Sequence, residues 1–487
     1  MPERKNILAL YDCRSKQEYI YRTNRVQEIT GASELLRSLF TDFFEDKNNG
    51  FKIKSDWRNE KAPENFLDVF NSEGYDAEIV YEGGGNLCVI FKDRETYIDV
   101  NKALSRQVLE KTFAVSIIAS ATEVTDNFAE DRKRLYAENA LQKNLGAYHT
   151  PCNVLPFTQV DRLTYLPVVK KSGNKNYSTE SLKKKEKYTS LPRPQEQILE
   201  YEFDNMVDKG NESLLAIIYI DGNNMGAKVK AATAGKTDYT SGINALREFS
   251  KQTDLDFVER PIKEIKDRLT SLYNNATDDK EKRKYLFRKV ISGGDEITIV
   301  CNAHAVPEIL ETYFNTLTGN SDNSACAGVA IFHSHDPFAD VYEIAEACCE
   351  MGKNVSHLKG NEGKNYIDFH YCHSGITNSL ETIRETQEKD YTQRPYEYSD
   401  SWKTFCKYGK LMAKFSKRSD VKALCTAIVK GDSYYKEELR RMKSRDSKKN
   451  LTEIFENEDE IKKIIFDIAI VYDLWFAEKG EDINEQN

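Results

Sequence analysis

The sequence predicts an α/β protein (α+β) built from two ferredoxin-like units, each with the strand and helix order βαββαβ. The first observation behind this prediction is the order of apolar strand patterns and helical patterns over residues 6–124. The second is the return of that order over residues 214–371. The third is that an acid at the end of the first strand and a glycine-rich hairpin recur in both units at nearly equal spacing, which indicates an internal repeat.

The first unit opens with a short apolar strand, because an unbroken apolar run of this length is typical of a buried strand. A glycine-rich turn between two apolar runs then predicts a hairpin. The elements expected in this unit are a strand at 6–12, helices over 16–45, a hairpin at 77–92, a helix at 94–112 and a strand at 114–124.

The second unit repeats this plan. Asp12 is 71 positions before Gly83, and Asp221 is 72 positions before Gly293. The expected elements are a strand ending at 221, helices over 238–275, a hairpin at 286–303, a helix at 306–317, a strand from 326, a helix at 340–354 and a strand at 366–371.

Two further regions differ in character from the repeat. Between the units, a helix at about 127–145 leads into a polar, lysine-rich segment that is predicted to be a mobile loop. Its lysines are Lys170, Lys171, Lys175, Lys183, Lys184, Lys185 and Lys187. After residue 375 the pattern is helical to the end, with an apolar last helix at about 459–477 and a basic cluster. The cluster is Arg440, Arg441, Lys443, Arg445, Lys448 and Lys449.

The composition is acidic and rich in charge: 31% of the 487 residues are charged, and the formal net charge is −9. This balance argues against a surface that coats nucleic acid, although local basic patches are compatible with it. No apolar run approaches the ~18 residues of a membrane span, and no signal peptide is predicted. The ten cysteines include no C-x-x-C pair, which predicts free thiols, a cytoplasmic location and no cysteine zinc site.

The strongest chemical signal is a set of three carboxylates. A fully apolar strand ends in Asp221, and an apolar hairpin carries Asp295 and Glu296 directly after two glycines. Side by side in one sheet, these acids would form a site for a hard cation, best suited to Mg²⁺ or Mn²⁺. Two such cations would suit phosphoryl chemistry. The alternative is an ordinary surface hairpin, which the Asp221 strand and the repeat make less favoured.

Aligning the two hairpins places Gly85 at the position of Asp295 and Asn86 at the position of Glu296. The first unit therefore keeps the glycines but lacks two of the three acids. We interpret the second unit as competent to bind metal and the first as a degenerate, nucleotide-holding unit.

These motifs resemble a known family. The second unit is similar to the catalytic palm of the large subunit of type III CRISPR effectors, which is related to GGDEF-type nucleotide cyclases. The matching stretches are Tyr-Ile-Asp-Gly-Asn-Asn-Met-Gly at 219–226, Ser-Gly-Gly-Asp-Glu at 292–296 and Ala-Cys-Cys-Glu-Met-Gly-Lys at 347–353. The first unit resembles the companion palm through Lys-Gln-Glu-Tyr-Ile at 16–20, Gly-Ala-Ser at 31–33 and Tyr-Glu-Gly-Gly-Gly-Asn at 81–86.

The resemblance implies four domains. These are a first, degenerate palm at 1–125, a helical and loop insert at 126–212, a second palm with the catalytic hairpin at 213–375 and a helical C-terminal domain at 376–487.

The resemblance also implies an activity, which is synthesis of a cyclic oligoadenylate or a cyclic dinucleotide from ATP in antiviral defence. It implies that Asp221, Asp295 and Glu296 are catalytic and ligate two Mg²⁺ or Mn²⁺ ions. Nucleotide contacts are implied for Gly222, Asn224, Gly293, Gly294 and Lys353 of the second palm, and for Ser33, Gly83, Gly84 and Gly85 of the first. Simpler interpretations are that Lys353 is a solvated helix residue and that Ser33 only contributes to its helix.

The sequence departs from the family pattern in four respects. Asn223 stands where the family usually has a second Asp, and Glu296 stands where the last acid is usually Asp. The fused nuclease domain is expected to be absent, and the cysteine pairs of the inter-palm zinc element are reduced to Cys152. These differences favour a smaller, free-standing enzyme of the same lineage.

Two other functions stay open. A non-catalytic large subunit would scaffold guide RNA and effector subunits, and Asn223 together with the degenerate first palm motivates this alternative. A phosphohydrolase would use His335 and Asp336, but these residues follow a strand beside Pro337, which is typical of a turn.

The lysine-rich segment and the basic cluster could bind RNA, but solvated faces are commoner. The sequence does not indicate the oligomeric state or the base and size of the product.

Overall fold

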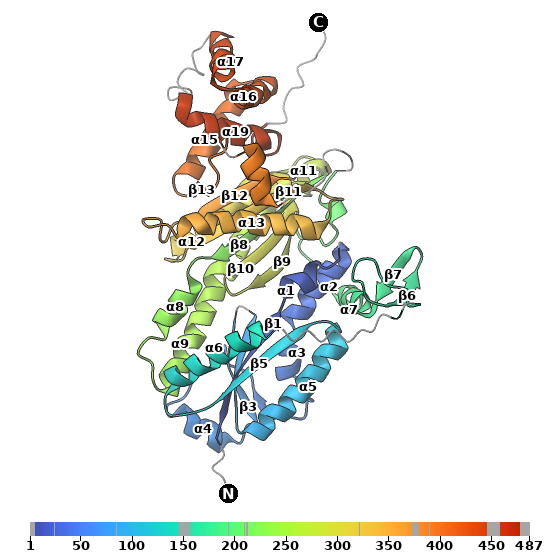
Figure 1. Ribbon diagram of the computed structural model, residues 1–487, viewed down its shortest axis with the longest axis vertical. Coiled ribbons are helices and arrows are strands. Elements are labelled where there is room, and N and C mark those ends of the chain that lie inside the picture. The colour runs from blue at the N-terminus through green and yellow to red at the C-terminus, as the bar shows by residue number, and fades with distance from the viewer. Residues whose placement is uncertain are drawn as a thin grey trace. The chain divides into compact units, whose positions relative to one another are not determined.

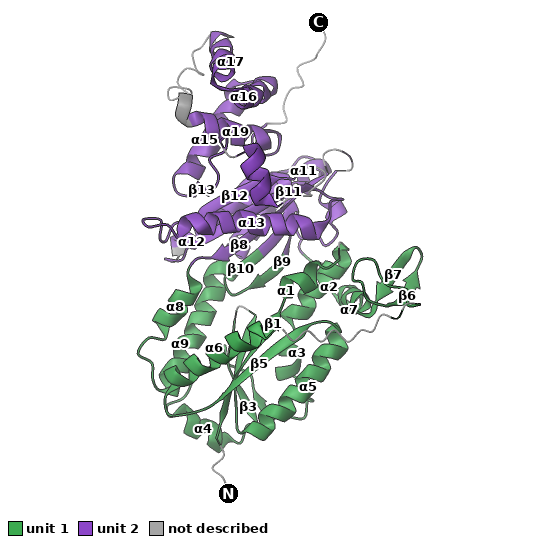
Figure 2. Ribbon diagram, viewed as in Figure 1, with its two compact units in different colours: residues 1–195, 224–260, 290–297 green, residues 196–223, 261–289, 298–487 purple. Residues whose placement is uncertain are grey.

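The computed structural model divides the chain into two compact units, coloured separately in Figure 2. Unit 1 comprises residues 1–195, 224–260 and 290–297, and unit 2 comprises residues 196–223, 261–289 and 298–487. The boundaries of these two units differ from those of the four predicted domains, and the four-domain division remains a prediction. The residues described are 5–23, 25–83, 85–145, 155, 157–192, 194–208, 210, 213–320, 322–372, 379–388, 390–445 and 458–477.

Unit 1 contains a five-stranded sheet with the order β2-β3-β4-β1-β5. Its strands β1, β3 and β5 are labelled in Figure 1. β1 is central and pairs antiparallel with both β4 and β5, so that Asp12 lies opposite Asn86 and Ile118. Four of the strands have the order β3-β4-β1-β5, which is that of a ferredoxin-like fold and confirms the prediction. The strands are β1 (Ile7–Arg14), β2 (Ile53–Lys54), β3 (Ala77–Gly83), β4 (Asn86–Phe91) and β5 (Ser116–Glu123).

An aromatic core closes the sheet of unit 1. Tyr11 of β1 is fully buried, and its ring lies within 6.5 Å of the rings of Phe40, Phe44 and Phe91. Burial of such large side chains is the main stabilising contribution to the first palm. The helices of unit 1 are α1 (Lys16–Tyr21), α2 (Val26–Arg37), α3 (Thr41–Phe44), α4 (Phe66–Glu73), α5 (Arg94–Thr112), α6 (Phe128–Asn144), α7 (Thr179–Ser190), α8 (Met225–Ala232), α9 (Tyr239–Asp254) and the π-helix η2 (Leu255–Glu259).

The prediction of a mobile lysine-rich loop is wrong. The segment forms the hairpin of β6 (Val168–Ser172) and β7 (Lys175–Ser178), followed by α7. Lys184 of α7 is fully buried, donates to Glu180 at 2.6 Å and lies 4.1 Å from the centre of the Tyr19 ring. The lysine-rich composition suggested that this segment is exposed to solvent. The ammonium group of Lys184 can nevertheless be buried, because it pairs with a carboxylate and lies over an aromatic ring.

Unit 2 holds the second repeat. The six-stranded sheet has the order β13-β12-β11-β8-β10-β9, in which β11-β8-β10-β9 repeats the ferredoxin-like order. β8 pairs antiparallel with β11, and β12 adds to β11 in parallel. The strands are β8 (Leu214–Gly222), β9 (Phe287–Gly293), β10 (Glu296–Asn302), β11 (Ala325–His333), β12 (Tyr366–Tyr371) and β13 (Tyr396–Glu397), and the turn end of β9 and β10 belongs to unit 1.

The helices of unit 2 include those after the second palm, among them the predicted apolar last helix. They are α10 (Arg260–Asn275, whose first residue belongs to unit 1), α11 (Asp279–Arg283), α12 (Val306–Asn320), α13 (Phe338–Ser356), α14 (Leu380–Ile383), α15 (Ser401–Phe415), α16 (Arg418–Lys430), α17 (Asp432–Arg445) and α19 (Glu458–Trp475). Short helical turns are η1 (Phe203–Asn205), η3 (Ala303–Ala305) and the π-turn η4 (Arg384–Glu388). In the described part of the chain, no helix combines the length and the apolar character that a bilayer crossing needs.

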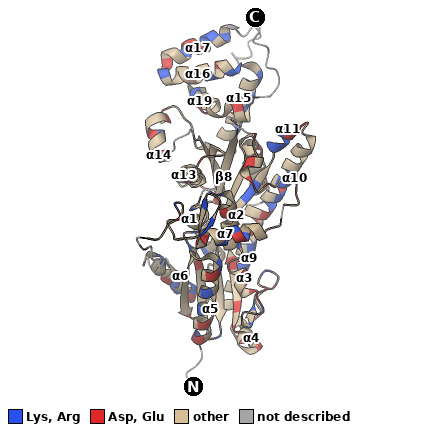
Figure 3. Cartoon of the chain, turned by 90° about the vertical axis from the view of Figure 1, so that its right-hand side faces the viewer, with Lys and Arg blue, Asp and Glu red and all other residues tan. Residues whose placement is uncertain are grey.

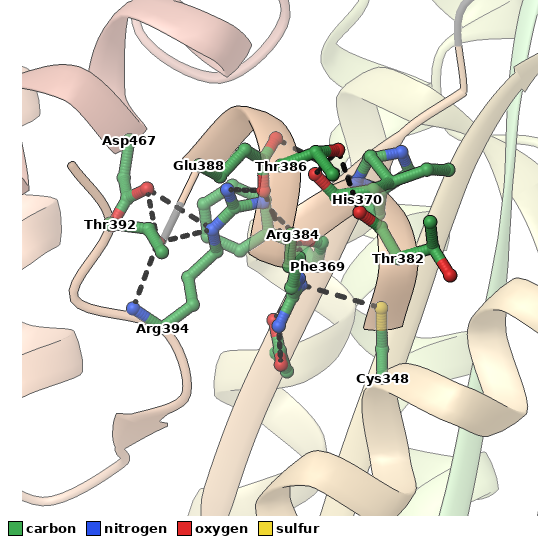
Figure 4. A network of polar contacts seen from close by, with 12 residues as sticks. Cys348, Phe369, His370, Thr382, Arg384, Thr386, Glu388, Thr392, Arg394 and Asp467 are labelled. Atoms are coloured by element: carbon green, nitrogen blue, oxygen red, sulfur yellow. Dashed lines mark hydrogen bonds and ion pairs between the residues drawn. The ribbon is translucent and has the colours of Figure 1, made fainter. Parts of the chain in front are cut away.

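A buried charge network attaches the C-terminal helices to the second palm (Figure 4). Arg384 binds both carboxylate oxygens of Asp368 on β12. Arg394 lies between Glu388, at 2.7 Å, and Asp467 of α19, at 3.1 Å. Because each buried charge has an opposite charge beside it, the attraction between the charges offsets the desolvation penalty of their burial.

Candidate functional site

Asp221 lies near the end of β8, a strand of unit 2 that is buried along most of its length. Its predecessors in the strand are apolar and buried, and Asp221 pairs in register with Cys326 of β11. The strand therefore fixes the backbone of Asp221 while its side chain keeps 24% exposure. Gly222, the next residue, is buried and pairs with Ala325.

Lys353 of α13 donates a charge-assisted hydrogen bond to the Asp221 carboxylate. The lysine side chain is 19% exposed, so the pair is shielded from bulk water yet reachable from it. The structure therefore brings together two residues that the sequence predicts for the site. An ammonium group held at this position can attract a phosphate as well as the carboxylate.

α13 carries three acidic side chains before Lys353, one of which, Glu346, interacts electrostatically with Asp221. Glu343, Glu346 and Glu350 share one helical face with Lys353, because their spacing is three or four residues. Burial raises the pKa of the Glu346 carboxyl, and the charges of Glu343, Asp221 and Glu350 raise it further. The negative charge here exceeds the single lysine, which favours a bound cation, and oxygen donors of this kind suit Mg²⁺ or Mn²⁺.

Asn223 is occupied by structural hydrogen bonds. Its side-chain nitrogen donates to Ser324 Oγ at 3.2 Å and to the Lys364 carbonyl at 3.1 Å, and its oxygen accepts from Cys326 Sγ at 3.3 Å. The amide thus joins the end of β8 to its neighbours in unit 2. Asn224, which follows, is exposed and has a positive φ of 58° at the start of α8.

The second glycine hairpin is part of unit 1. Gly294 has a φ of 62°, a conformation that glycine adopts without strain. A Cβ atom added to Gly293 would meet no atom within 4 Å, so the space above this backbone is open to a ligand. Asp295 and Glu296 are half-buried at the start of β10.

Asp254 of α9 holds this hairpin. Its Oδ1 accepts the Gly294 N–H at 3.0 Å, and its carboxylate pairs with Arg58 at 3.2 Å. Burial raises the pKa of Asp254, while Arg58 and the Gly294 N–H act in the opposite direction. The sequence analysis missed Asp254, because nothing in a helical pattern indicates which acid faces a distant backbone amide.

One turn earlier, Ser250 of α9 holds the first glycine hairpin. Its Oγ donates to the Glu82 carbonyl at 2.6 Å, and a Cβ atom on Gly83 would lie 2.5 Å from that Oγ. The absence of a side chain at Gly83 therefore serves the packing of α9. The predicted nucleotide contact of Gly83 remains a prediction, and Gly84 lies outside the described residues.

Two other predicted residues of the first palm have neighbours within unit 1. Ser33 of α2 donates to the Val290 carbonyl of β9. Gly85 has a φ of 74°, and a Cβ atom there would lie 1.8 Å from Lys16 Nζ. Lys16 is thus held beside the first hairpin, directly against its backbone.

The complete three-carboxylate site remains a prediction. Asp221 belongs to unit 2, whereas Asp295 and Glu296 belong to unit 1. Within the stretches that the structure describes, no three His, Cys, Asp or Glu side chains are grouped closely enough to hold a metal ion. The carboxylate oxygens of Asp221, Asp295 and Glu296 are of the kind that Mg²⁺ and Mn²⁺ prefer as ligands.

The alternative site residues have structural partners. Asp336 accepts the His333 N–H at 3.0 Å, and the His335 N–H donates to His333 Nδ1 at 3.3 Å, as expected for a turn. The basic segments are likewise mixed with acids, and Figure 3 shows blue and red residues interspersed along the helices. Cys152 lies outside the described residues.

Both sheets contain a ferredoxin-like strand order, and unit 2 places the pair of Asp221 and Lys353 near the end of β8. Residues 214–367 match the family model of the Cas10/Cmr2 second palm domain. Over these residues the match confirms the resemblance to the type III CRISPR large subunit.

Solved structures share the fold over nearly the whole chain. The Csm1-Csm4 cassette in complex with cA3 matches with a TM-score of 0.52 and 13% identity, covering 98% of this chain and 70% of that one. The complex with cA4 gives 0.51 and 13%, covering 96% and 69%, and the complex with one ATP gives 0.51 and 14%, covering 97% and 70%. No curated protein matches the sequence.

Proposed function

We propose that the second palm is the catalytic domain of a metal-dependent nucleotidyltransferase that converts ATP into a cyclic oligoadenylate or a cyclic dinucleotide. The observation that carries the proposal is the partly buried pair of Asp221 and Lys353 at the end of β8. The sheet order adds support, because β10, which begins with Glu296, neighbours β8. Structures of the same fold hold ATP, cA3 and cA4.

The proposed roles follow from the chemistry of each group. Asp221, Asp295 and Glu296 would hold Mg²⁺ or Mn²⁺, which when bound supplies activation of a hydroxyl and neutralisation of phosphate charge. Lys353 stabilises negative charge on the phosphate during transfer. The open backbone at Gly293 lets a nucleotide approach closely, and exposed Asn224 is within the same motif as Asp221.

In the proposed reaction, the 3′-hydroxyl oxygen of one ATP forms a bond to the α-phosphorus of another, and the bond from that phosphorus to pyrophosphate breaks. Repetition of this step and a final intramolecular step close the ring. Lys353 needs to stay protonated to serve the departing charge. Its hydrogen bond to the Asp221 carboxylate holds the ammonium group near the end of β8.

The test is to incubate the pure protein with each α-³²P-labelled nucleoside triphosphate and Mg²⁺ or Mn²⁺, and to resolve the products. We expect a phosphatase-resistant product from ATP that is lost in the Asp295→Ala/Glu296→Ala double variant. A product that persists at full yield in this variant would refute the proposed site.

A scaffold subunit that binds guide RNA and effector subunits is the second candidate. The observation that favours it is the engagement of Asn223, whose amide is committed to hydrogen bonds within unit 2. RNA and protein partners that co-purify with a chain that never turns over ATP would support the scaffold. Turnover by the purified chain would exclude a purely structural role.

A further inference from the structure

Asn223 follows Asp221 by two positions and is buried, with an exposure of only 3%. Its main chain continues the pairing of β8 with β11, because the Asn223 N–H donates to the Ser324 carbonyl at 2.8 Å. A side chain buried this fully does not face solvent. Any effect that it has on a reaction must therefore pass through the residues that it contacts.

Three contacts fix the orientation of the Asn223 amide. Its nitrogen donates to Ser324 Oγ and to the Lys364 carbonyl, and its oxygen accepts from Cys326 Sγ. Exchange of the nitrogen and the oxygen would place the amide oxygen against the Lys364 carbonyl with no hydrogen between them. Because these partners lie at the starts of β11 and β12, the amide joins the ends of three neighbouring strands, β8, β11 and β12.

Cys326 connects this amide to α13. It pairs in register with Asp221 on β8. A Cβ atom added to Gly352, the residue before Lys353, would lie 3.5 Å from Cys326 Sγ, so α13 packs closely against this thiol. The thiol of Cys326 therefore lies between the Asn223 amide and the turn of α13 that carries Lys353.

The contacts form a closed path through the candidate site of unit 2. The path runs along the chain from Asp221 to Asn223, and through the Cys326 thiol to α13. It returns through the hydrogen bond that Lys353 donates to the Asp221 carboxylate. The amide thus supports both members of the ion pair, and such support matters because reacting groups need fixed positions.

We propose that Asn223 is a positioning residue, whose neutral amide holds Asp221 and Lys353 in the geometry for nucleotidyl transfer. An ionised Asp at this position has no hydrogen to donate, so it would face the buried Lys364 carbonyl as one acceptor against another. A role for residue 223 as a metal ligand predicts the opposite result, because a charged oxygen attracts a cation more strongly than an amide oxygen does. The role in transfer rests on the proposed function, whereas the hold on the end of β8 does not.

The test compares Asn223→Asp with the unaltered full chain in the synthesis of cyclic product from α-³²P-labelled ATP and Mg²⁺. We expect kcat to fall about tenfold or more, because a buried acceptor loses its donor, with a smaller change in KM for ATP. Cys326→Ser keeps a donor for the Asn223 oxygen and should retain most of the activity. Cys326→Ala removes that donor and should lose part of it.

Asn302→Asp is the matched control. Asn302 is a buried asparagine of the same unit, and its amide also donates to a main-chain carbonyl, that of Met206, at 2.8 Å. It ends β10, whereas Glu296 begins that strand. We expect comparable lowering of the melting temperature in the two variants but a lowered kcat only in Asn223→Asp. Equal losses of kcat would show an effect of stability alone and would overturn the positioning role.

Amide hydrogen exchange of the full chain gives a second measurement that needs no activity. We expect Asn223→Asp to speed exchange in residues 217–223 and 324–327, and Asn302→Asp to leave these residues unchanged. If no form of the chain makes a cyclic product while exchange is faster there, the proposed function fails and the hold of Asn223 on β8 stands. If the unaltered chain makes the product and Asn223→Asp is at least as active, the positioning role is overturned and the proposed function stands.

Discussion

At the scale of single residues, Asp254 holds the hairpin that we propose to be catalytic through the Gly294 amide. We predict that Asp254→Ala lowers kcat for nucleotide synthesis about tenfold, because a lost hydrogen bond to a charged group is worth roughly 1.5–3 kcal/mol and frees the hairpin. Asp254→Asn should recover part of the loss, since its amide oxygen can still accept the Gly294 N–H. Steady-state kinetics of both variants would test this.

Glu248→Ala is the control for this prediction, because Glu248 is an exposed acid on the same helix. A merely structural role for Asp254 predicts equal losses in Asp254→Ala and Asp254→Asn together with lowered melting temperatures. A change in KM alone would likewise contradict a role in holding the catalytic hairpin.

Glu346 makes a pH-dependent contribution to stability. Its pKa is raised in the folded protein by burial and by neighbouring carboxylates, so ionisation of this group costs folded-state stability. That cost is absent at low pH, where the group is protonated in both states, and grows as pH rises through its ordinary range. We therefore predict that Glu346→Gln raises the free energy of unfolding at pH 7 but has little effect at pH 4.

Chemical denaturation at the two pH values measures this difference. Glu350→Gln is the comparison, because Glu350 is exposed on the same face and should show a smaller change. An equal stabilisation by Glu346→Gln at pH 4 and pH 7 would contradict the electrostatic explanation.

At the scale of elements, α19 is attached to the second palm through Asp467. Its carboxylate is fully buried and accepts from Tyr396 Oη at 2.6 Å as well as pairing with Arg394. We predict that Asp467→Ala costs about 3–5 kcal/mol of unfolding free energy, because it leaves a buried arginine with one partner fewer. Asp473→Ala, which removes an exposed pair with Arg418 on the same helix, should cost less than about 1 kcal/mol.

Urea denaturation of both variants, monitored by the tryptophans near α19, would decide this. Similar small losses in Asp467→Ala and Asp473→Ala would show that the network does not stabilise the unit.

The sequence predicted elements well where the pattern was periodic and poorly where burial depended on a partner. The helix at 94–112 and the hairpins have the bounds expected from apolar periodicity. The sequence did not predict α7, because the burial of its Lys184 depends on contacts with Glu180 and the Tyr19 ring. Gly31 of α2 lets the backbone of Lys184 pack closely against α2. A single sequence does not reveal such pairings.

The candidate site was predictable in part. Asp221 and Lys353, to which the resemblance gave separate roles as a metal ligand and a nucleotide contact, form an ion pair in unit 2. Ser250 and Asp254 could not have been found, because their partners are main-chain groups in the two distant hairpins. The hydrogen bonds of the Asn223 side chain could likewise be found only from the structure.

At the scale of the whole molecule, a ferredoxin-like strand order occurs twice in the chain, and the first strand of each carries an acid whose neighbours differ. The first palm surrounds Asp12 with lysines and an amide, and the second places one lysine and one acid, Glu346, near Asp221. The same substitution should therefore have different consequences in the two palms. This asymmetry is the central claim of the account.

The most direct measurement compares Asp12→Asn with Asp221→Asn, the same chemical change at repeat-equivalent positions, in the synthesis of cyclic product from labelled ATP with Mg²⁺. We predict that Asp221→Asn lowers the rate at saturating ATP at least about 100-fold, because metal-dependent stabilisation of the transition state is lost. Asp12→Asn should retain turnover at saturating ATP. Equal losses in the two variants, or full activity in Asp221→Asn, would contradict the assignment of metal-dependent catalysis to the second palm.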